Sequence, residues 1–441
     1  VLIADDVVDQ RYRTVSMQIL ESVGLGPFAR IVLISLALAG IPSLAQSGAG
    51  DAQPSPRLID WVEQALAQSP ELQARAAALA AARARLSGSG LPIYNPELEL
   101  EYENTEIDLT TAELSQTLDW HGKRGARERV AEGGVALARA EYDARRERLA
   151  GELLDALAGY EGGRAAADLA ERQSVLLKRF AEIARKRGRA GDLGEVEVEL
   201  AQLAYVKGKM AAARVQADVA DAGSTLYRIT GSADTKGAAL PRVPAMTLPI
   251  TGSPQELGGR HPAVRAARAR AQTASAAVRQ ADLDRRADPT FGIKGGREDD
   301  ENLIGLRLSI PLQFLNDYRA DVDAARSESV QATEDGAQVE RTTQAQLQAE
   351  QMRFEKLAAA WRVWENEGRG RLDARLKLLE RLWRAGELAT TDYLVQVQQT
   401  LDTESAGLAL RRDLWGAWIA WLRAAGQVQA WLGLERQGES Q

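Results

Sequence analysis

The sequence predicts a mainly α-helical protein with a small β part, built from one structural half that is copied once. Three observations lead to this fold class: segments that recur in the same order, two helical stretches of unusual length, and four segments that alternate apolar with polar residues. The alanine-rich composition, with only 5% aromatic residues, also favours long helices.

The duplication is visible in pairs of short segments that keep their order along the chain. The pairs are Ser69-Pro70-Glu71-Leu72 with His261-Pro262-Ala263-Val264, Asn95-Pro96 with Asp288-Pro289, Ser115-Gln116-Thr117-Leu118 with Ser309-Ile310-Pro311-Leu312, and Gly191-Asp192-Leu193 with Gly386-Glu387-Leu388. They predict two structural repeats, residues 58–231 and 254–433, joined by a Pro- and Gly-containing linker at 232–253. Residues 434–441 then form a short tail.

Each repeat reads as a helix, two strands, a very long helix, a tight turn and a returning helix. In the first repeat we expect a helix over Leu58–Leu86 and strands over Glu97–Asn104 and Thr111–Trp120. In the second, Phe291 and Ile293 mark one strand, and the alternation from Ile304 to Ile310 marks the other. Strict alternation of this kind is typical of half-buried strands.

The two long stretches, Lys123–Arg187 and Tyr318–Arg384, contain no proline. As helices they would be about 97 and 100 Å long at 1.5 Å per residue, a length found in coiled coils and long helical barrels. Gly188–Gly191 and Ala385-Gly386 predict left-handed residues in tight turns. We expect Asp192 and Glu387 in the first turn of the returning helices, which should end near Gly231 and Gly433.

Composition argues against an enzyme. Cysteine is absent, and the only histidines are His121 and His261. The chain therefore has no thiolate ligands for a metal and too few histidines to favour a histidine metal site or a Ser/His triad. We expect structural or exposed roles for both histidines, and no catalytic residue, cofactor or metal site. The net charge of −7 argues against a protein that coats nucleic acid.

The start of the chain has the order of a secretory signal peptide. Arg30 precedes the apolar run Ile31–Ala39, and Ser43-Leu44-Ala45 resembles a cleavage site. We therefore expect residues 1–45 to be a leader, with Met17 as a candidate true start. Residues 46–57 should be a flexible segment before the first repeat.

Taken together, these motifs resemble the TolC-like outer-membrane efflux family, and within it the heavy-metal-cation (CzcC-type) branch. The resemblance rests on the paired segments above and on Gly122-Lys123-Arg124, and it covers roughly residues 58–433. It implies a homotrimer in the outer membrane, with each chain giving four strands to one twelve-stranded barrel. It also implies that the long helices form a periplasmic tunnel that docks a periplasmic adaptor and an inner-membrane pump of the RND type.

Combined with the alternation, the resemblance assigns site residues. The leucines, Tyr102 and Trp120 should face lipid. The polar residues of the strands should line the lumen: Glu97, Glu99, Glu101, Glu103, Glu113, Asp119 and Arg307. The turns at the ends of the long helices should contact the adaptor, through Arg189, Gly191, Asp192, Gly386, Glu387 and Thr390.

The sequence thus favours a passive exit duct of a tripartite efflux system, with divalent heavy-metal cations as a candidate substrate. Two alternatives stay open. One is an exit channel for type I protein secretion, and the other is an exported coiled-coil scaffold that never enters the membrane. The strand pairs favour the duct over the scaffold, because a scaffold has no need for apolar-out, acidic-in strands.

Overall fold

The computed structural model describes residues 53–104, 108–232, 234–248 and 253–434. The expected leader, residues 1–45, lies outside the described residues. Parts of three other predicted segments do so too: residues 46–52, residues 233 and 249–252 of the linker, and residues 435–441 of the tail. The boundaries predicted for the two repeats stay predictions.

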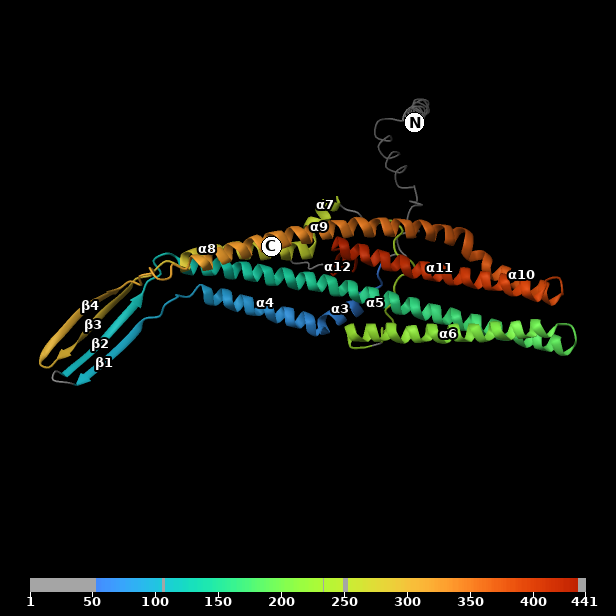
Figure 1. Ribbon diagram of the computed structural model, residues 1–441, viewed down its shortest axis with the longest axis horizontal. Helices are drawn as coiled ribbons and strands as arrows, with labels where there is room; N and C mark the ends of the chain where they lie inside the picture. The colour runs from blue at the N-terminus through green and yellow to red at the C-terminus, as the bar shows by residue number, and fades with distance from the viewer. Residues whose placement is uncertain (1–52, 105–107, 233, 249–252, 435–441) are drawn as a thin grey trace, which may run out of the picture. The chain divides into compact units, whose positions relative to one another are not determined.

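Helices make up most of the described chain. In the first half they are α3 (Pro56–Gln68), α4 (Pro70–Ser89), α5 (Lys123–Arg189) and α6 (Glu195–Thr230). In the second half they are α7 (Pro254–Arg260), α8 (Pro262–Asp284), α9 (Arg319–Val363), the π-helical turn η2 (Trp364–Gly368), the 3₁₀ turn η3 (Arg369–Arg371), α10 (Leu372–Arg384), α11 (Thr390–Ala425) and α12 (Val428–Trp431). Each half folds its long helix back into a hairpin, and the two hairpins lie side by side (Figure 1).

Four antiparallel strands form one sheet in the order β1-β2-β3-β4. They are β1 (Glu97–Asn104), β2 (Asp108–Thr117), β3 (Thr290–Glu298) and β4 (Glu301–Ser309). β1 has the predicted bounds, whereas β2 begins and ends three residues before the predicted Thr111–Trp120. Because β2 of the first half pairs along its length with β3 of the second, the halves share one sheet.

The single helix predicted over Leu58–Leu86 is wrong, because the chain divides it into α3 and α4. Ser69 lies between them with extended backbone (φ −66°, ψ 118°), and its hydroxyl accepts a hydrogen bond from the backbone N–H of Leu72 at 3.4 Å. Pro70 occupies the first position of α4. Proline suits that position but disfavours helical backbone at the residue before it, so Ser69 becomes a cap.

The second long helix is also interrupted, whereas α5 of the first half is continuous. The predicted helix Tyr318–Arg384 begins one residue later and is divided by η2 and η3. The ring of Trp364 packs on Gly407 of α11, where a Cβ would clash with the ring. The ring also covers Gly368 one turn further on. A π-helical turn accommodates such an inserted side chain, and we attribute the interruption to this contact.

Two apolar clusters hold the helices together. The larger one lies where α3, α5, α9 and α11 meet and contains Leu153, Leu157, Trp418 and Trp421. The smaller one lies in the tip half of the two hairpins, around Trp383. These tryptophans pack between helices.

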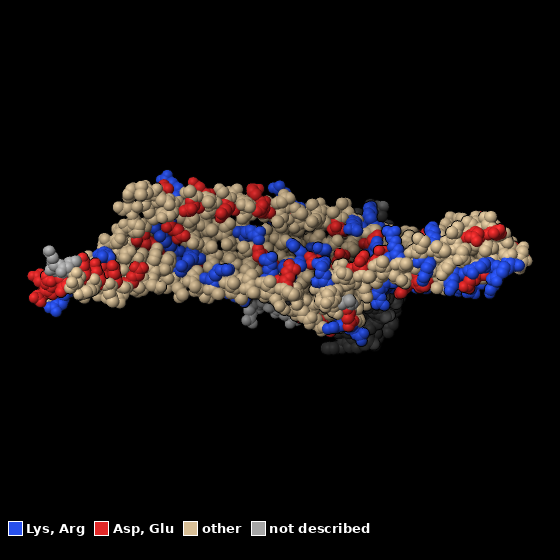
Figure 2. Space-filling view, turned by 60° about the horizontal axis from the view of Figure 1, so that its bottom comes forward, with Lys and Arg blue, Asp and Glu red and all other residues tan. Residues whose placement is uncertain are grey.

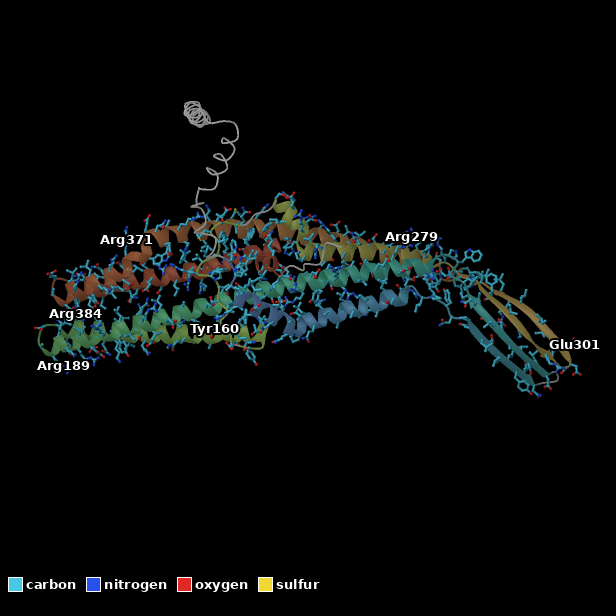
Figure 3. The ribbon with its side chains drawn as sticks, turned by 180° about the vertical axis from the view of Figure 1, so that it is seen from behind. Tyr160, Arg189, Arg279, Glu301, Arg371 and Arg384 are labelled. Carbon is cyan, nitrogen blue, oxygen red and sulfur yellow. The ribbon has the colours of Figure 1, made fainter. Side chains whose placement is uncertain are left out.

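The sheet lies at one end of the helices and the hairpin turns lie at the other. Glu301 marks the sheet end, and Arg189 and Arg384 mark the two turns at the opposite end (Figure 3). None of the described helices combines the length and the apolar character that crossing a membrane requires.

Candidate functional site: a two-faced sheet and paired helical tips

The sheet has one polar face and one apolar face, and its register aligns both across all four strands. On the polar face Glu97, Glu99, Glu101 and Glu103 follow one another along β1. The register places Glu99 directly opposite Glu113 of β2, and Glu113 opposite Lys294 of β3. Side chains on one face of a sheet repeat every second residue, so these groups share a surface.

The apolar face is continuous and exposed. One row across the sheet is Leu98, Leu114, Ile293 and Leu306. The next row includes Leu100 and Ile304, and the exposed fractions reach 86% at Ile304 and Leu306. An apolar patch of this extent is unusual for a surface that faces water and marks an interaction site. In the described chain, β1 and β4 each pair on one side only, so both edges of the sheet are open.

Ion pairs cross the polar face between strands that are distant in sequence. Lys294 Nζ lies 2.8 Å from Glu101 Oε2. Arg307 of β4 lies between two carboxylates, with Nε 3.1 Å from Glu113 Oε1 and Nη1 3.6 Å from Glu99 Oε2. Two bases therefore balance part of the predicted acidic lining, while Glu97 and Glu103 are exposed and have no ion pair with any described residue.

Acidic residues also gather at the far end of the sheet. Asp299 and Asp300 form the exposed turn between β3 and β4, with Glu298 and Glu301 at the adjoining strand ends. Acidic side chains dominate this end in the space-filling view (Figure 2). This end lies opposite the helical tips.

Asp119, expected on the polar face of a strand, lies beyond the end of β2. Its two carboxylate oxygens accept hydrogen bonds from the backbone N–H groups of Lys123 at 2.7 Å and Arg124 at 2.9 Å. These are the first two residues of α5, whose free N–H groups and dipole favour an anion. Asp119 therefore stabilises the start of the long helix.

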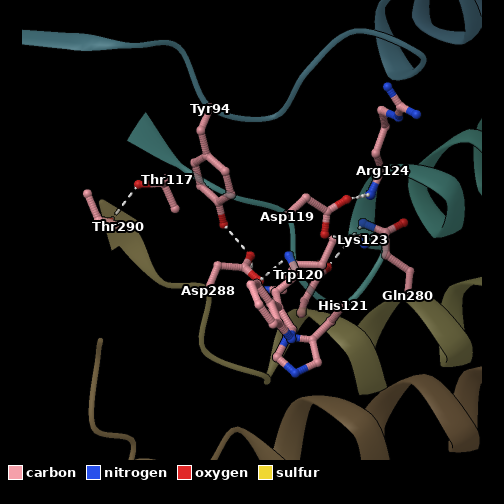
Figure 4. Close-up of polar contacts among 11 residues, drawn as sticks. Tyr94, Thr117, Asp119, Trp120, His121, Lys123, Arg124, Gln280, Asp288 and Thr290 are labelled. Carbon is pink, nitrogen blue, oxygen red and sulfur yellow. Dashed lines mark hydrogen bonds and ion pairs between the residues drawn. The ribbon is translucent and has the colours of Figure 1, made fainter. Parts of the chain in front are cut away.

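A buried carboxylate joins the sheet to the helices where the two meet. Asp288, 5% exposed, precedes β3 and accepts a hydrogen bond from the Tyr94 hydroxyl at 2.9 Å (Figure 4). Lys123 Nζ lies 2.9 Å away, and His121 Nδ1 lies 3.4 Å away. The histidine therefore has an acidic partner that the sequence did not reveal. The sequence identified Asp288 only as part of a repeated Asp-Pro pair. Its role could not be predicted, because its partners lie in the other half of the chain.

The surroundings of Asp288 shift the pKa values of Asp288 and of Tyr94. Burial raises the pKa of the Asp288 carboxyl, but hydrogen bonds from Lys123, Tyr94 and His121 outweigh burial and lower the pKa overall. Burial, together with the hydrogen bond to Asp288, raises the pKa of Tyr94 to about 12. Asp288 is therefore the charged member of the pair, and Tyr94 is the neutral donor.

His261 also has a structural role. Its Nδ1 accepts a hydrogen bond from the backbone N–H of Ala263 at 3.1 Å, which caps α8, while Nε2 lies 3.0 Å from the carbonyl oxygen of Arg423. This arrangement needs a neutral ring that donates from Nε2. Burial lowers the pKa of His261, which favours the same form. Within the described residues, no three His, Cys, Asp or Glu side chains gather as a metal-binding group.

Both helical tips have the same backbone geometry. Gly191 (φ 83°) and Gly386 (φ 77°) are left-handed, as predicted. The N–H of Asp192 bonds the carbonyl of Arg187 at 2.9 Å, and the N–H of Glu387 bonds that of Leu382 at 3.0 Å. Each helix therefore ends in a Schellman motif.

The returning helices begin later than predicted. Asp192 and Glu387 lie in the turns and not in the first turn of a helix, because the extended residues Gly194 and Ala389 come before the helices as their N-caps. α6 ends at Thr230 with Gly231 as its C-cap, near Gly231 as predicted. α11 ends at Ala425 with Gly426 (φ 65°) as its C-cap, well before Gly433, and the short helix α12 follows.

The tip residues predicted to contact an adaptor differ in exposure. Arg189, Gly191, Asp192, Gly386 and Glu387 are exposed. Thr390 is 2% exposed, and its hydroxyl accepts a hydrogen bond from Trp383 Nε1 at 3.2 Å. The structure therefore uses Thr390 inside the tip, where its side chain cannot reach another protein.

Arg187 connects the two tips, a role that the sequence did not indicate. Its Nη1 donates a hydrogen bond to the carbonyl oxygen of Trp383 at 3.2 Å, and its guanidinium lies 5.5 Å from the centre of the Trp383 ring. Phe180 and Tyr393 pack on the same tryptophan. The two tips thus pack as one unit around Trp383.

Comparison with known proteins gives the same architecture. Residues 61–232 match the family model described as outer membrane efflux protein. A comparison with curated proteins finds no match.

Several solved structures share the fold. The outer-membrane channel OprN has a TM-score of 0.72 at 19% identity, and the match covers 84% of this chain and 90% of that one. The outer membrane protein VceC from Vibrio cholerae has a TM-score of 0.69 at 19% identity, covering 85% and 99%. The open-state MtrE outer membrane channel of Neisseria gonorrhoeae has a TM-score of 0.71 at 16% identity, covering 87% and 93%. The chain therefore has the TolC-like channel fold, with long helices and a small β part.

Proposed function

We propose that this protein is the outer-membrane exit duct of a tripartite efflux system. Three copies would join their sheets into one twelve-stranded barrel, and their helices would form a tunnel into the periplasm. The tips would contact a periplasmic adaptor that connects the duct to an inner-membrane pump of the RND type. The duct would pass its substrate without any chemistry of its own.

The observation that carries this proposal is the continuous exposed apolar face of a sheet whose two edges are open. Unpaired backbone groups are not tolerated in lipid, so such a sheet can enter a membrane only if other strands close it. Four strands are too few for a barrel, while twelve lie within the usual range. An exported scaffold that stayed in water would leave this apolar face uncovered, which argues against that alternative.

The helices support the second part of the proposal. α5 has 67 residues, which corresponds to about 100 Å of continuous helix. The two tip turns, marked by Arg189 and Arg384 in Figure 3, lie at the end opposite the sheet. Arg189, Asp192 and Glu387 are exposed in these turns. A partner that docks at the tips would therefore be far from the outer membrane, where a periplasmic adaptor is expected.

The charges on the polar face support cations as the substrate class. Five glutamates of β1 and β2 point to this face, against Lys294 and Arg307. A lining with a surplus of carboxylates favours the passage of cations. Divalent heavy-metal cations fit this lining, and we include them in the proposal as the candidate substrate.

Adjacent residues on opposite faces of β4 provide a matched test. Ile304 lies in the apolar row with Leu100, whereas Leu303 lies on the polar face opposite Gly296. Ile304→Arg should reduce outer-membrane insertion, by about 2–4 kcal/mol if the residue lies near the bilayer midplane. Leu303→Arg should insert normally, because the lumen contains water.

The readout is the amount of each variant in the outer-membrane fraction that requires detergent for extraction. Normal insertion of Ile304→Arg together with loss of Leu303→Arg would show that the faces are reversed. Recovery of the unmodified protein as a water-soluble periplasmic protein would contradict the proposed function.

A further inference from the structure

The register places two like charges opposite each other on the polar face. Glu99 of β1 and Glu113 of β2 are direct cross-strand partners. Side chains in this relation have their Cβ atoms about 5 Å apart, and like charges there destabilise the sheet. Two carboxylates at this spacing also form a pair of oxygen ligands that suits a hard divalent cation.

Arg307 occupies the place between these carboxylates. Its Nε lies 3.1 Å from Glu113 and its Nη1 lies 3.6 Å from Glu99, so one guanidinium serves both. The side chain of Glu113 is only 4% exposed, whereas that of Arg307 is 50% exposed and thus open to the space above the polar face.

Gly292 of β3 provides the room for this contact. It lies between Ser115 and Arg307 in the register. A Cβ at this position would lie 2.6 Å from Glu113 Oε1 and 3.4 Å from Arg307 Cβ. Any larger residue would therefore displace the Glu113 carboxylate, so the backbone of β3 is matched to the ion pair above it.

We propose that Arg307 determines how the pore responds to divalent cations, by occupying the position where a divalent cation would otherwise bridge Glu99 and Glu113. The inference rests on the proposed function, since it needs the polar face to line a pore. Conduction requires that an ion bind strongly enough to enter but weakly enough to leave. With Arg307 in place, the formal charge of the Glu99–Glu113 pair is halved from −2 to −1, so the pair releases cations more readily. Without it, three copies would expose six uncompensated carboxylates.

The test is single-channel recording of the purified full-length protein in planar bilayers, in KCl with added CaCl₂. Arg307→Gln should lower the Ca²⁺ concentration that halves the K⁺ current by roughly tenfold, the lower end of the range by which charged clefts concentrate counter-ions. Gly292→Ala should shift the same concentration in the same direction, because it displaces Glu113 without removing a charge. Arg307→Lys should stay close to the unmodified protein, since it retains a cation.

The matched control is Arg297→Gln, which removes an arginine from β3 on the opposite face, in the row of Tyr102. It should leave the Ca²⁺ response unchanged. An equal Ca²⁺ response of Arg307→Gln and the unmodified channel would overturn the inference while leaving the proposed function intact. Absence of channels from Arg307→Gln alone would also overturn it, because Arg307 would then be an assembly residue. Absence of channels from the unmodified protein would instead reject the proposed function.

Discussion

At the residue scale, the junction between sheet and helices depends on one buried charge. The side chain of Asp288 is 2% exposed, and Tyr94, His121 and Lys123 all contact its carboxylate. Removing one partner of a buried ion pair leaves the other charge uncompensated, which costs far more than breaking a pair at the surface. A neutral substitution of Asp288 should therefore destabilise the junction between β3 and α5.

We expect Asp288→Asn to lower the free energy of unfolding by about 3–5 kcal/mol, because it leaves the Lys123 ammonium buried without a counter-charge. Thermal unfolding in detergent measures this. The control is Asp282→Asn, whose ion pairs with Arg285 and Arg286 lie at the surface and should contribute far less to stability. Equal stability losses in the two variants would contradict the role given to Asp288.

The same site predicts a pH dependence. Because the folded protein lowers the pKa of Asp288, its contribution to stability is complete above the unfolded value of about 3.9. It is lost as the pH falls through the lower folded value. Asp288→Asn should therefore flatten the decline in thermal stability below about pH 4.

At the element scale, the tip turns depend on left-handed glycines. Gly386 has φ 77°, and no atom lies within 4 Å of the position where its Cβ would be. Gly416 in α11 is equally uncrowded, but it has ordinary helical backbone. The two positions therefore differ in backbone conformation and not in available space.

Gly386→Val should destabilise the second tip by about 1–2 kcal/mol, the cost of left-handed backbone for a residue with a Cβ. Hydrogen exchange should become faster at the N–H groups of Gly386 and Glu387, and export of substrate should fall while the sheet is unaffected. Gly416→Val should change neither. Unchanged exchange and full export by Gly386→Val would count against the importance of this turn.

Local sequence signals predicted most of the elements. The alternation in Glu97–Asn104 gave the bounds of β1, and the glycines gave the left-handed turns. The break at Ser69-Pro70, which our prediction of one helix missed, has a local signal in the proline. The interruption of the second long helix was not, because it depends on Trp364 reaching Gly407 of another helix.

At the scale of the whole molecule, the sequence predicted the duplicated, mainly helical fold. It also predicted which strand residues share the polar face and which share the apolar face. It could not predict the contacts between halves. Lys123 and Asp288, or Arg187 and Trp383, are brought together only by the pairing of β2 with β3 and the packing of the two hairpins. Asp119 was misplaced for a related reason, since a strand that ends three residues earlier releases it to cap α5.

The central claim is that copies of this chain complete one another's sheet in the outer membrane. Native mass spectrometry of the protein extracted in detergent from outer membranes counts those copies directly. The account predicts a complex of three chains, which Ile304→Arg should deplete and Leu303→Arg should retain. A stable single chain in the outer-membrane extract, with its apolar sheet face and both edges uncovered by other copies, would contradict it.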